Sequence, residues 1–546
     1  MKTKATPQTT QDLLAIFNDF FGDDLHSAEV VNPSEIHLLV DEAMFYEGAA
    51  FIHSNLLFKS TFITLVATDE RRLNNQFNLH GVFLLKAQKV VVTLITGLDG
   101  ENPSYKALTP LIPAAEWLER ELHDLFGIEA EGVDLKPLVL HRGWPKAHPY
   151  VMHKDVAKDT PIELTDTDHE FGFTSPASAH QVAVGPIHAG IIEPGHLRFC
   201  VTGERIHHFD AQLFYTHKGI EKMAEGKTIY EGLTLAEHVC GLCAFSHSLA
   251  YSQAVESLCQ ITPSERTQAI RRLLLEMERL ANHFADLTAI CSAGGFGFAS
   301  ARAAYFRESI MQLNKHLTGH RFLRDFNTLG GLKSDLQAAT LDMAFETLDK
   351  LKSPYRQWVE MLYNKDSFLD RVEGAGLLGK QQALDLGIVG PSARGSGVVE
   401  DLRHDYPQGM GQPNYPTFSV PSQTDGDVRA RMQVRIDEVY ESLMLIRQTL
   451  STMAQDGVDP AAPTKPLKPN PETPGIGLVE SAKGGLLHWL VLEASAPVPT
   501  INRWHVRSAS YMNWRGMAAA TMGNNIVPDG PLVNKSFNLC YACSDR

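Results

Sequence analysis

The chain has 546 residues, of which 44% are hydrophobic, and a formal net charge of −15 at pH 7. A chain of this length exceeds one ordinary hydrophobic core, so we expect at least two folded domains. Negative charge without a long lysine or arginine block argues against nucleic-acid binding and against a polybasic membrane anchor, because both need clustered cations. The first residues lack a leader pattern, and no apolar run approaches the roughly 18–20 residues that cross a bilayer. We therefore expect a cytosolic protein.

The first part of the chain mixes helix and strand patterns. Residues 10–21, TQDLLAIFNDFF, have the spacing of an amphipathic helix, and β-rich runs follow at residues 34–40, 60–68 and 89–96. This mixture predicts a small α/β domain over residues 1–155.

The pattern then changes twice. Residues 156–178 are polar, acidic and poor in large apolar side chains, which is typical of a linker or an extended surface arm. The remainder, residues 179–546, opens with strand-like sequence at 180–204. It continues with long helical patterns, of which residues 264–290 and 426–450 are the clearest.

The predicted fold class is α+β, with a small N-terminal α/β domain followed by a larger, mainly helical domain. One interruption is expected within the second domain. Residues 459–477, DPAAPTKPLKPNPETPGIG, contain prolines that cannot continue a helix, so they predict a loop.

Cysteine is scarce but unevenly used. Of seven cysteines, four form two Cys-x-x-Cys pairs, Cys240 with Cys243 and Cys540 with Cys543. In a reducing compartment such pairs bind metal or do redox work more often than they form structural disulfides. The spacing leaves three interpretations open: a structural zinc site, a site for another metal, and thiols unrelated to a metal. Thiolates are soft ligands that suit nickel, iron or copper.

A histidine extends the first cysteine pair. If a helix begins at Cys240, then Cys240, Cys243 and His247 lie on one face at i, i+3 and i+7. A histidine there can hydrogen-bond a metal-bound thiolate. The alternative is an ordinary structural histidine on a helix face.

Two motifs carry a resemblance to a known family. EHVCGLCAFSH, residues 237–247, resembles the first cysteine motif of nickel-iron hydrogenase large subunits, and NLCYACSDR, residues 538–546, resembles their terminal one. GPSARGSGVVEDLRHDYP resembles both group 4 hydrogenases and the 49 kDa subunit of respiratory complex I, and WLERELHDLFGIEAEGVDLKPLVLHRGWPKAHPY is similar to the 30 kDa subunit. A fusion of these two domains that keeps four cysteines resembles the large subunit of formate hydrogenlyase, a membrane-associated group 4 enzyme.

The resemblance implies a nickel-iron centre with carbonyl and cyanide ligands on the iron. All four paired cysteines would bind nickel, and Cys243 and Cys543 would also bridge to the iron. Glu193 would begin the proton route beside a nickel-bound cysteine, with a surface carboxylate as the alternative. Glu221 would lie at a divalent-ion site, for example for magnesium, or in a salt bridge facing Arg546. A plain helix-surface glutamate is the alternative there.

Two positions depart from the family pattern. Where these hydrogenases place an arginine over the centre, this chain has Lys483, and where aspartate-proline precedes the terminal cysteine it has Asn538 followed by leucine. A lysine ammonium is compact and able to lose its proton, whereas a guanidinium is fixed and effectively always charged. Both changes put normal turnover in question, but neither removes a metal ligand.

Two further features take their meaning from the resemblance. Glu276, Arg279 and His283 form a polar stripe at i, i+3 and i+7, which is usually solvated, and only the resemblance suggests that it is buried. Arg546 stands where a maturation protease of the family cuts, so the resemblance implies a processed end.

The resemblance predicts the catalytic large subunit of a hydrogenase that reversibly reduces protons to dihydrogen. Electrons would come from an iron-sulfur small subunit, because Cys200, Cys259 and Cys291 lack ferredoxin-type spacing. Other expected partners are ferredoxin-like electron-transfer subunits, complex I-like membrane subunits, and maturation proteins including a C-terminal endopeptidase. These would hold the protein on the inner face of the cell membrane. The alternative function is a complex I-like coupling or quinone-reactive subunit without hydrogen chemistry.

Overall fold

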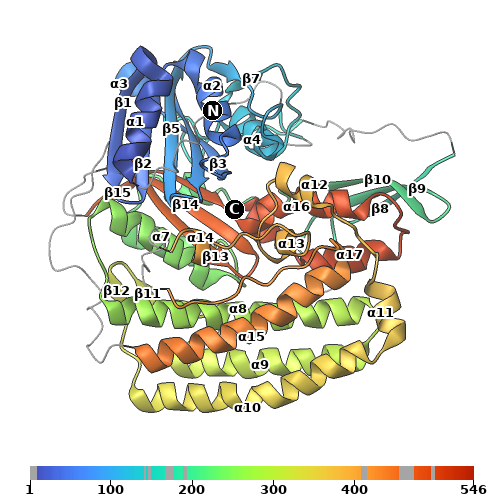
Figure 1. Cartoon of the computed structure of the whole chain (residues 1–546). Coiled ribbons are helices and arrows are strands. Elements are labelled where there is room, and N and C mark those ends of the chain that lie inside the picture. The colour runs from blue at the N-terminus through green and yellow to red at the C-terminus, as the bar shows by residue number, and fades with distance from the viewer. Residues whose placement is uncertain are drawn as a thin grey trace, which may run out of the picture. The chain divides into compact units, whose positions relative to one another are not determined.

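The computed structural model describes residues 9–140, 143–145, 149–165, 178–188, 193–407, 415–453, 473–493 and 498–546 (Figure 1). The chain divides into two compact units. One comprises Met1–Phe171 with Asp405–Gly409, and the other comprises Gly172–His404 with Met410–Arg546. The domain limits expected from the sequence stay a prediction, since residues 166–177, within the expected linker, lie outside the described residues.

The first unit is built on a five-stranded sheet in the order β1-β2-β5-β4-β3. Its elements are α1 (Thr10–Phe21), η1 (Gly22–Asp24), β1 (Leu25–Asn32), β2 (Glu35–Val40), α2 (Glu42–Ser54), β3 (Ser60–Asp69), α3 (Arg71–Asn74), β4 (Gln76–Leu85), β5 (Val90–Asp99), β6 (Ser104–Lys106), η2 (Pro113–Ala115), α4 (Glu116–Phe126) and β7 (Glu129–Glu131). β2 and β5 run parallel and the other neighbours antiparallel. Thr9 and Asp12 form a capping box that starts α1. The prediction of a small α/β domain is confirmed.

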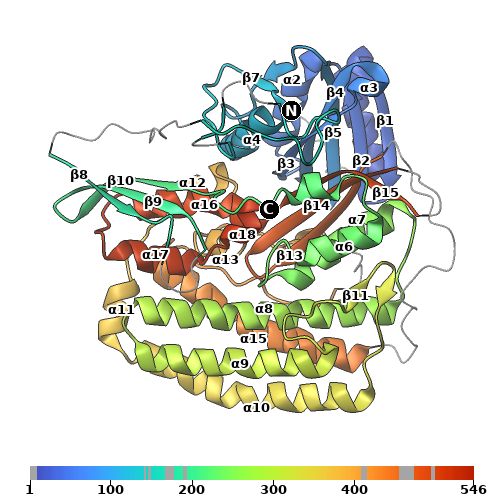
Figure 2. The ribbon, with the colours of Figure 1, turned by 180° about the vertical axis from the view of Figure 1, so that it is seen from behind.

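The second unit is dominated by helices. They are α5 (Ile220–Ala224), α6 (Ile229–Glu237), α7 (Ala244–Leu258), α8 (Glu265–Ala293), α9 (Gly297–Thr318), α10 (Ala338–Tyr363), α11 (Asp366–Val372), α12 (Lys380–Asp385), α13 (Gly390–Arg394), α14 (Leu402–Asp405), α15 (Val428–Thr452), α16 (Ala509–Thr521), α17 (Asp529–Phe537) and α18 (Tyr541–Asp545). The four longest, α8, α9, α10 and α15, lie side by side (Figures 1 and 2). Ser264 and Asp427 cap α8 and α15 by accepting backbone N–H groups. The prediction of a larger, mainly helical second domain is confirmed.

Three small sheets complete this unit. Their strands are β8 (His180–Val184), β9 (His196–Thr202), β10 (Arg205–Gln212), β11 (Asn327–Thr328), β12 (Gly331–Leu332), β13 (Gly475–Ser481), β14 (Gly484–Glu493) and β15 (Thr500–Arg507). The sheet β13-β14-β15 packs against α7. Packing is so close that a Cβ on Gly477 would lie 1.7 Å from the carbonyl oxygen of Ala250, so only glycine fits there.

A tight turn joins β13 to β14. Ser481 pairs with Gly484, which leaves Ala482 and Lys483 at the tip. We call residues Ser481–Gly484 the β13–β14 turn. The loop expected at residues 459–477 is shorter at its end than predicted, since β13 begins at Gly475; residues 459–472 of that loop lie outside the described residues.

Candidate metal centre

The two cysteine pairs meet in one buried cluster. Cys240 and Cys243 lie in the turn between α6 and α7, while Cys540 and Cys543 lie at the start of α18. The Sγ atoms of Cys240 and Cys540, which are 300 residues apart in sequence, are 3.3 Å apart. The sulfurs of Cys240, Cys540 and Cys543 all lie within 4.8 Å of one another, and Cys243 packs in the same cluster.

The chemistry of this donor set fits a soft metal. Hydrogen bonds from the neighbouring thiols, that of Cys243 first, hold the pKa of Cys240 well below its usual value. The backbone N–H groups of Leu242 and Cys543 point at the sulfurs of Cys240 and Cys540, at 3.3 and 3.4 Å. Convergent thiolates with N–H donors suit nickel and iron, so these residues fit the centre that the resemblance implies.

The start of α7 explains how Cys243 is kept available. The condition considered from the sequence, a helix that begins at Cys240, is not met, because α7 begins at Ala244, one residue after Cys243, which is the N-cap residue. The Cys243 side chain makes no capping hydrogen bond. Instead the carboxylate of Glu278 on α8 accepts the N–H of Phe245 at 2.8 Å and that of Ser246 at 3.2 Å. Glu278 therefore caps α7 and leaves the Cys243 sulfur to the cluster.

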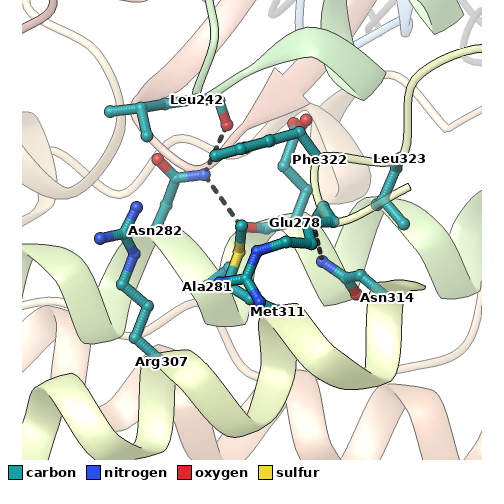
Figure 3. Close-up of a pocket in the computed structure, with 10 residues that line it drawn as sticks. Leu242, Glu278, Ala281, Asn282, Arg307, Met311, Asn314, Phe322 and Leu323 are labelled. Carbon is teal, nitrogen blue, oxygen red and sulfur yellow. Dashed lines mark hydrogen bonds between the residues drawn. The ribbon is translucent and has the colours of Figure 1, made fainter. Parts of the chain in front are cut away.

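A small cavity lies behind the cysteine turn (Figure 3). Its volume of about 20 Å³ suffices for about one water molecule, and Leu242, Glu278, Asn282 and Phe322 help to line it. Asn282 donates to the carbonyl oxygens of Leu242 and Glu278, both at 2.9 Å. Burial raises the pKa of Glu278 to about 7. Sequence reasoning missed Glu278 and Asn282, although their i, i+4 spacing on α8 was a usable signal.

His247 lies beside the cluster in a chain of hydrogen bonds. Burial lowers the pKa of His247 to about 4 and that of His488 well below its usual value, so both rings are neutral at pH 7. The indole N–H of Trp504 donates to Nδ1 of His488 at 3.1 Å, since an indole nitrogen only donates. His488 then carries its proton on Nε2 and donates to Nδ1 of His247 at 2.9 Å. The remaining N–H of His247 points at the Cys543 sulfur, 3.8 Å away.

Glu193 lies next to the terminal cysteine motif. Its Oε2 accepts the backbone N–H of Ala542 at 2.8 Å and lies 3.9 Å from the sulfur of Cys540. The side chain is partly buried. This position is compatible with the expected proton route, and the role of Glu193 stays a prediction.

Lys483 and Asn538, the two departures from the family pattern, meet at one carboxylate. The Lys483 ammonium lies 2.5 Å from Oδ1 of Asp286 on α8, and the Asn538 amide donates to the same oxygen at 2.6 Å. Arg435 donates to Oδ2 at 2.8 Å. Burial alone would raise the pKa of Asp286, but Lys483 and Arg435 outweigh it and hold that pKa below its usual value. Asp286 is a site residue that sequence reasoning missed.

Comparison with family models matches three parts of the chain. Residues 299–475 match "Respiratory-chain NADH dehydrogenase, 49 Kd subunit", and residues 38–160 match the 30 Kd subunit of the same enzyme. Residues 218–290, which contain Cys240 and Cys243, match "Nickel-dependent hydrogenase".

Individual relatives span most of the chain. It is 34% identical to formate hydrogenlyase subunit 5 of Escherichia coli over 494 residues, covering 88% of this chain and 84% of the relative. It is 32% identical to hydrogenase-4 component G of the same organism, covering 88% and 83%. The chain belongs to the group 4 nickel-iron hydrogenase large subunits of the formate hydrogenlyase type.

A solved structure matches the fold of this chain as well. A chain in the structure of the membrane-bound sulfane sulfur reductase, an archaeal respiratory membrane complex, has a TM-score of 0.62 at 27% identity. The match covers 68% of the present chain and all of the other. Among the described residues, no helix of this chain is both long enough and apolar enough to cross a membrane.

Glu221 is held by arginine side chains. Its Oε2 lies 2.7 Å from Arg503 and its Oε1 lies 3.1 Å from Arg546, while the N–H of Val506 donates to Oε1 at 2.9 Å. Burial would raise the pKa of Glu221, but the two guanidinium groups hold it well below its usual value. A divalent ion would have to share this carboxylate with two fixed positive charges. These residues therefore do not fit a divalent ion.

The stripe of Glu276, Arg279 and His283 is buried and ion-paired. Arg279 donates to Glu276 at 3.2 Å, and His283 lies 2.7 Å from Glu438 on α15. None of the three stripe residues is more than 1% exposed. The usual solvated interpretation of such a stripe is therefore wrong for this chain. Asp286 continues the stripe at i+3 from His283, which is the signal that could have identified it.

Proposed function

We propose that this chain is the catalytic large subunit of a membrane-associated nickel-iron hydrogenase that reversibly reduces protons to dihydrogen, within a formate hydrogenlyase-like complex. The observation that carries the proposal is the meeting of two Cys-x-x-Cys pairs, 300 residues apart, in one buried cluster. The relatives named as hydrogenases span most of the chain and support it.

In this proposal all four cysteines would hold nickel, and Cys243 and Cys543 would also hold an iron that carries carbonyl and cyanide. When bound, the nickel-iron centre would supply the redox-active site at which protons, electrons and dihydrogen are exchanged. Glu193 passes protons to and from the site, because its carboxylate lies 3.9 Å from the Cys540 sulfur. His247 donates an N–H to the Cys543 thiolate, and Lys483, paired with Asp286, supplies a positive charge beside the site.

The proposal includes partner proteins. An iron-sulfur small subunit delivers electrons, ferredoxin-like subunits feed it, and complex I-like membrane subunits hold the assembly on the cytoplasmic face of the membrane. Maturation proteins, including a C-terminal endopeptidase, insert the metals. The iron-sulfur clusters lie in partners only, because Cys200, Cys259 and Cys291 lie outside the described thiol cluster.

Metal analysis of the purified complex tests the proposal directly. We expect nickel and iron, infrared bands of iron-bound carbonyl and cyanide, and hydrogen evolution from a reduced low-potential donor. A complex that contains one zinc per chain and none of these bands would exclude a hydrogenase and return the site to structural zinc.

A second function has one observation in its favour. The site differs from the family pattern at Lys483 and Asn538. The two side chains lie next to each other in space, because both contact Oδ1 of Asp286. A complex I-like coupling or quinone-reactive subunit without hydrogen chemistry would tolerate that difference. Its mark would be quinone-dependent electron transfer in a complex without nickel.

Lys483→Ala is expected to lower hydrogen turnover about tenfold or more, since a positioned charge is lost from the site. It also leaves Asp286 without one of its two cationic partners, and breaking a buried pair this way costs about 3–5 kcal/mol of stability. Lys483→Arg should keep turnover, because the charge stays. Hydrogen rates and thermal unfolding of the three proteins are the measurements. Lys350→Ala is the control, because it removes an exposed lysine of α10. An inactive Lys350→Ala or a fully active Lys483→Ala would contradict the role of Lys483.

A further inference from the structure

The buried stripe on α8 belongs to a larger ionic cluster. Its acidic members are Glu276, Asp401, Glu438 and Glu480, and its basic members are Arg279, Arg394 and Arg403. All seven are at most 2% exposed. They come from α8, α13, α14 and its preceding residue, α15 and β13, so the cluster ties together most of the second unit.

The charges in this cluster do not balance if every group is ionised. Four carboxyl groups face three guanidinium groups in direct ion pairs, and the buried guanidinium of Arg507 faces Glu480 only at longer range. His283 does not supply the missing charge, because burial lowers its pKa and keeps the ring neutral at pH 7. An uncompensated buried charge is costly, so one carboxyl group is expected to keep its proton.

Among the four, Glu480 has the fewest cationic contacts. Asp401 has two contacts with Arg403, and Glu438 has two with Arg394 and one with His283. Glu276 contacts two arginines and accepts from Ser442 and Tyr415. Glu480 contacts only Nη1 of Arg394, at 3.0 Å, and that nitrogen also lies 3.4 Å from Asp401.

With its remaining neighbours included, Glu480 is still the carboxyl group of the cluster with the fewest cationic contacts. The backbone N–H of Leu402 donates to its Oε2 at 3.3 Å. Arg507 on β15 faces Glu480 at longer range and donates to the carbonyl oxygen of Gly485. Burial, followed by the charge of Asp401, raises the pKa of Glu480 to about 7 against the opposing effect of Arg394.

Glu480 also lies at the base of the β13–β14 turn. Arg279 donates to the carbonyl oxygen of Glu480 at 2.6 Å and to that of Ser481 at 3.0 Å. The Ser481 hydroxyl accepts the N–H of Lys483 at 3.3 Å and donates to the carbonyl oxygen of Gly484 at 2.7 Å. The cluster therefore holds the turn whose tip carries Lys483.

We propose that Glu480 is a positioning residue that keeps its proton near neutral pH and in that state holds the β13–β14 turn, and with it Lys483, in place for turnover. Above neutral pH the proton leaves to solvent, Glu480 becomes negatively charged, and the support of the turn changes. No other bond forms or breaks. The link to turnover depends on the proposed hydrogenase function, whereas the protonation of Glu480 does not.

Glu480→Gln in the purified complex tests both parts, because glutamine has the shape of the protonated acid. Infrared difference spectra between about pH 6 and 8 should show buried carboxylic acid C=O bands in the wild type that are lost on raising the pH, and the variant should lack one of them. Glu278 and Glu237, whose pKa values burial also raises to about 7, should keep theirs in the variant. The ratio of hydrogen rates at the two pH values should be at least about threefold smaller in the variant.

Two further variants keep the result interpretable. Glu346→Gln removes an exposed carboxyl group on α10 and should leave both readouts unchanged. Glu480→Asp keeps an ionisable group and should keep the pH dependence. If Glu480→Gln keeps every acid band of the wild type, the proton belongs to another group and the proposal is overturned. If the band is lost but the rate ratio is unchanged, the positioning role is overturned.

A wild type without hydrogen turnover would reject the hydrogenase function, while the infrared result would still decide where the proton is.

Discussion

Replacing Cys240, Cys243, Cys540 or Cys543 singly with serine is expected to abolish hydrogen turnover. Each replacement exchanges a soft thiolate for a hydroxyl, which is a poor ligand for nickel. The four sulfurs lie in one cluster, so the loss of any one leaves an incomplete set of donors. Nickel content per chain and hydrogen evolution by the purified complexes are the measurements.

Cys259→Ser provides the matched control for these four variants. Cys259 is the C-cap residue of α7, at the other end of the helix that follows Cys243. Burial raises the pKa of its thiol to about 11, so it is a protonated thiol outside the cluster at pH 7. This variant should keep nickel and activity. Retention of both by any of the four cluster variants would reject the metal site.

Glu193→Gln is expected to slow hydrogen production by about 10²-fold or more, which is the usual contribution of a positioned acid or base. Glutamine keeps an oxygen that can accept the N–H of Ala542, as Glu193 does at 2.8 Å, but it cannot carry the proton. The infrared bands of the centre should therefore be unchanged while the rate falls.

Glu231→Gln, on the exposed face of α6, controls for the loss of a carboxylate. A wild-type rate in Glu193→Gln would mean that protons enter elsewhere. Glu237 would then be examined next, because it is buried, its pKa is raised to about 7 by burial, and it accepts the N–H of Asp325.

The fold class and the two Cys-x-x-Cys pairs were predictable because both depend on local sequence patterns. Periodicity gave the strands of the first unit and helices such as α8 and α15, and Cys-x-x-Cys spacing singled out four of seven cysteines. The start of α7 was not predictable in this way. A carboxylate from α8, Glu278, caps that helix across 33 positions of sequence, and no local signal at Cys243 reports it.

The polar groups around the cysteines were the harder part for the same reason. Asp286 belongs to the site because it binds Lys483 and Asn538, which lie 197 and 252 positions away in the sequence. The role of His488 depends on its hydrogen bonds with His247 and Trp504, which lie on other elements. Helical spacing predicts which residues share a face, but it does not predict whether that face is covered by other charged groups. The buried stripe on α8 shows this directly.

The 300 positions between Cys240 and Cys540 also set a time interval. At about 5–20 residues per second, a ribosome adds this stretch in roughly 15 to 60 s. During that time the first thiol pair has been made and its partners have not. Any thiol-seeking ion present in the cell, zinc included, can reach an open pair in such an interval, and tight binding would make the error persistent. If the cluster holds metal as proposed, selection of the correct metal is thus a matter of timing as well as affinity, because the first pair meets competing ions before the second pair exists.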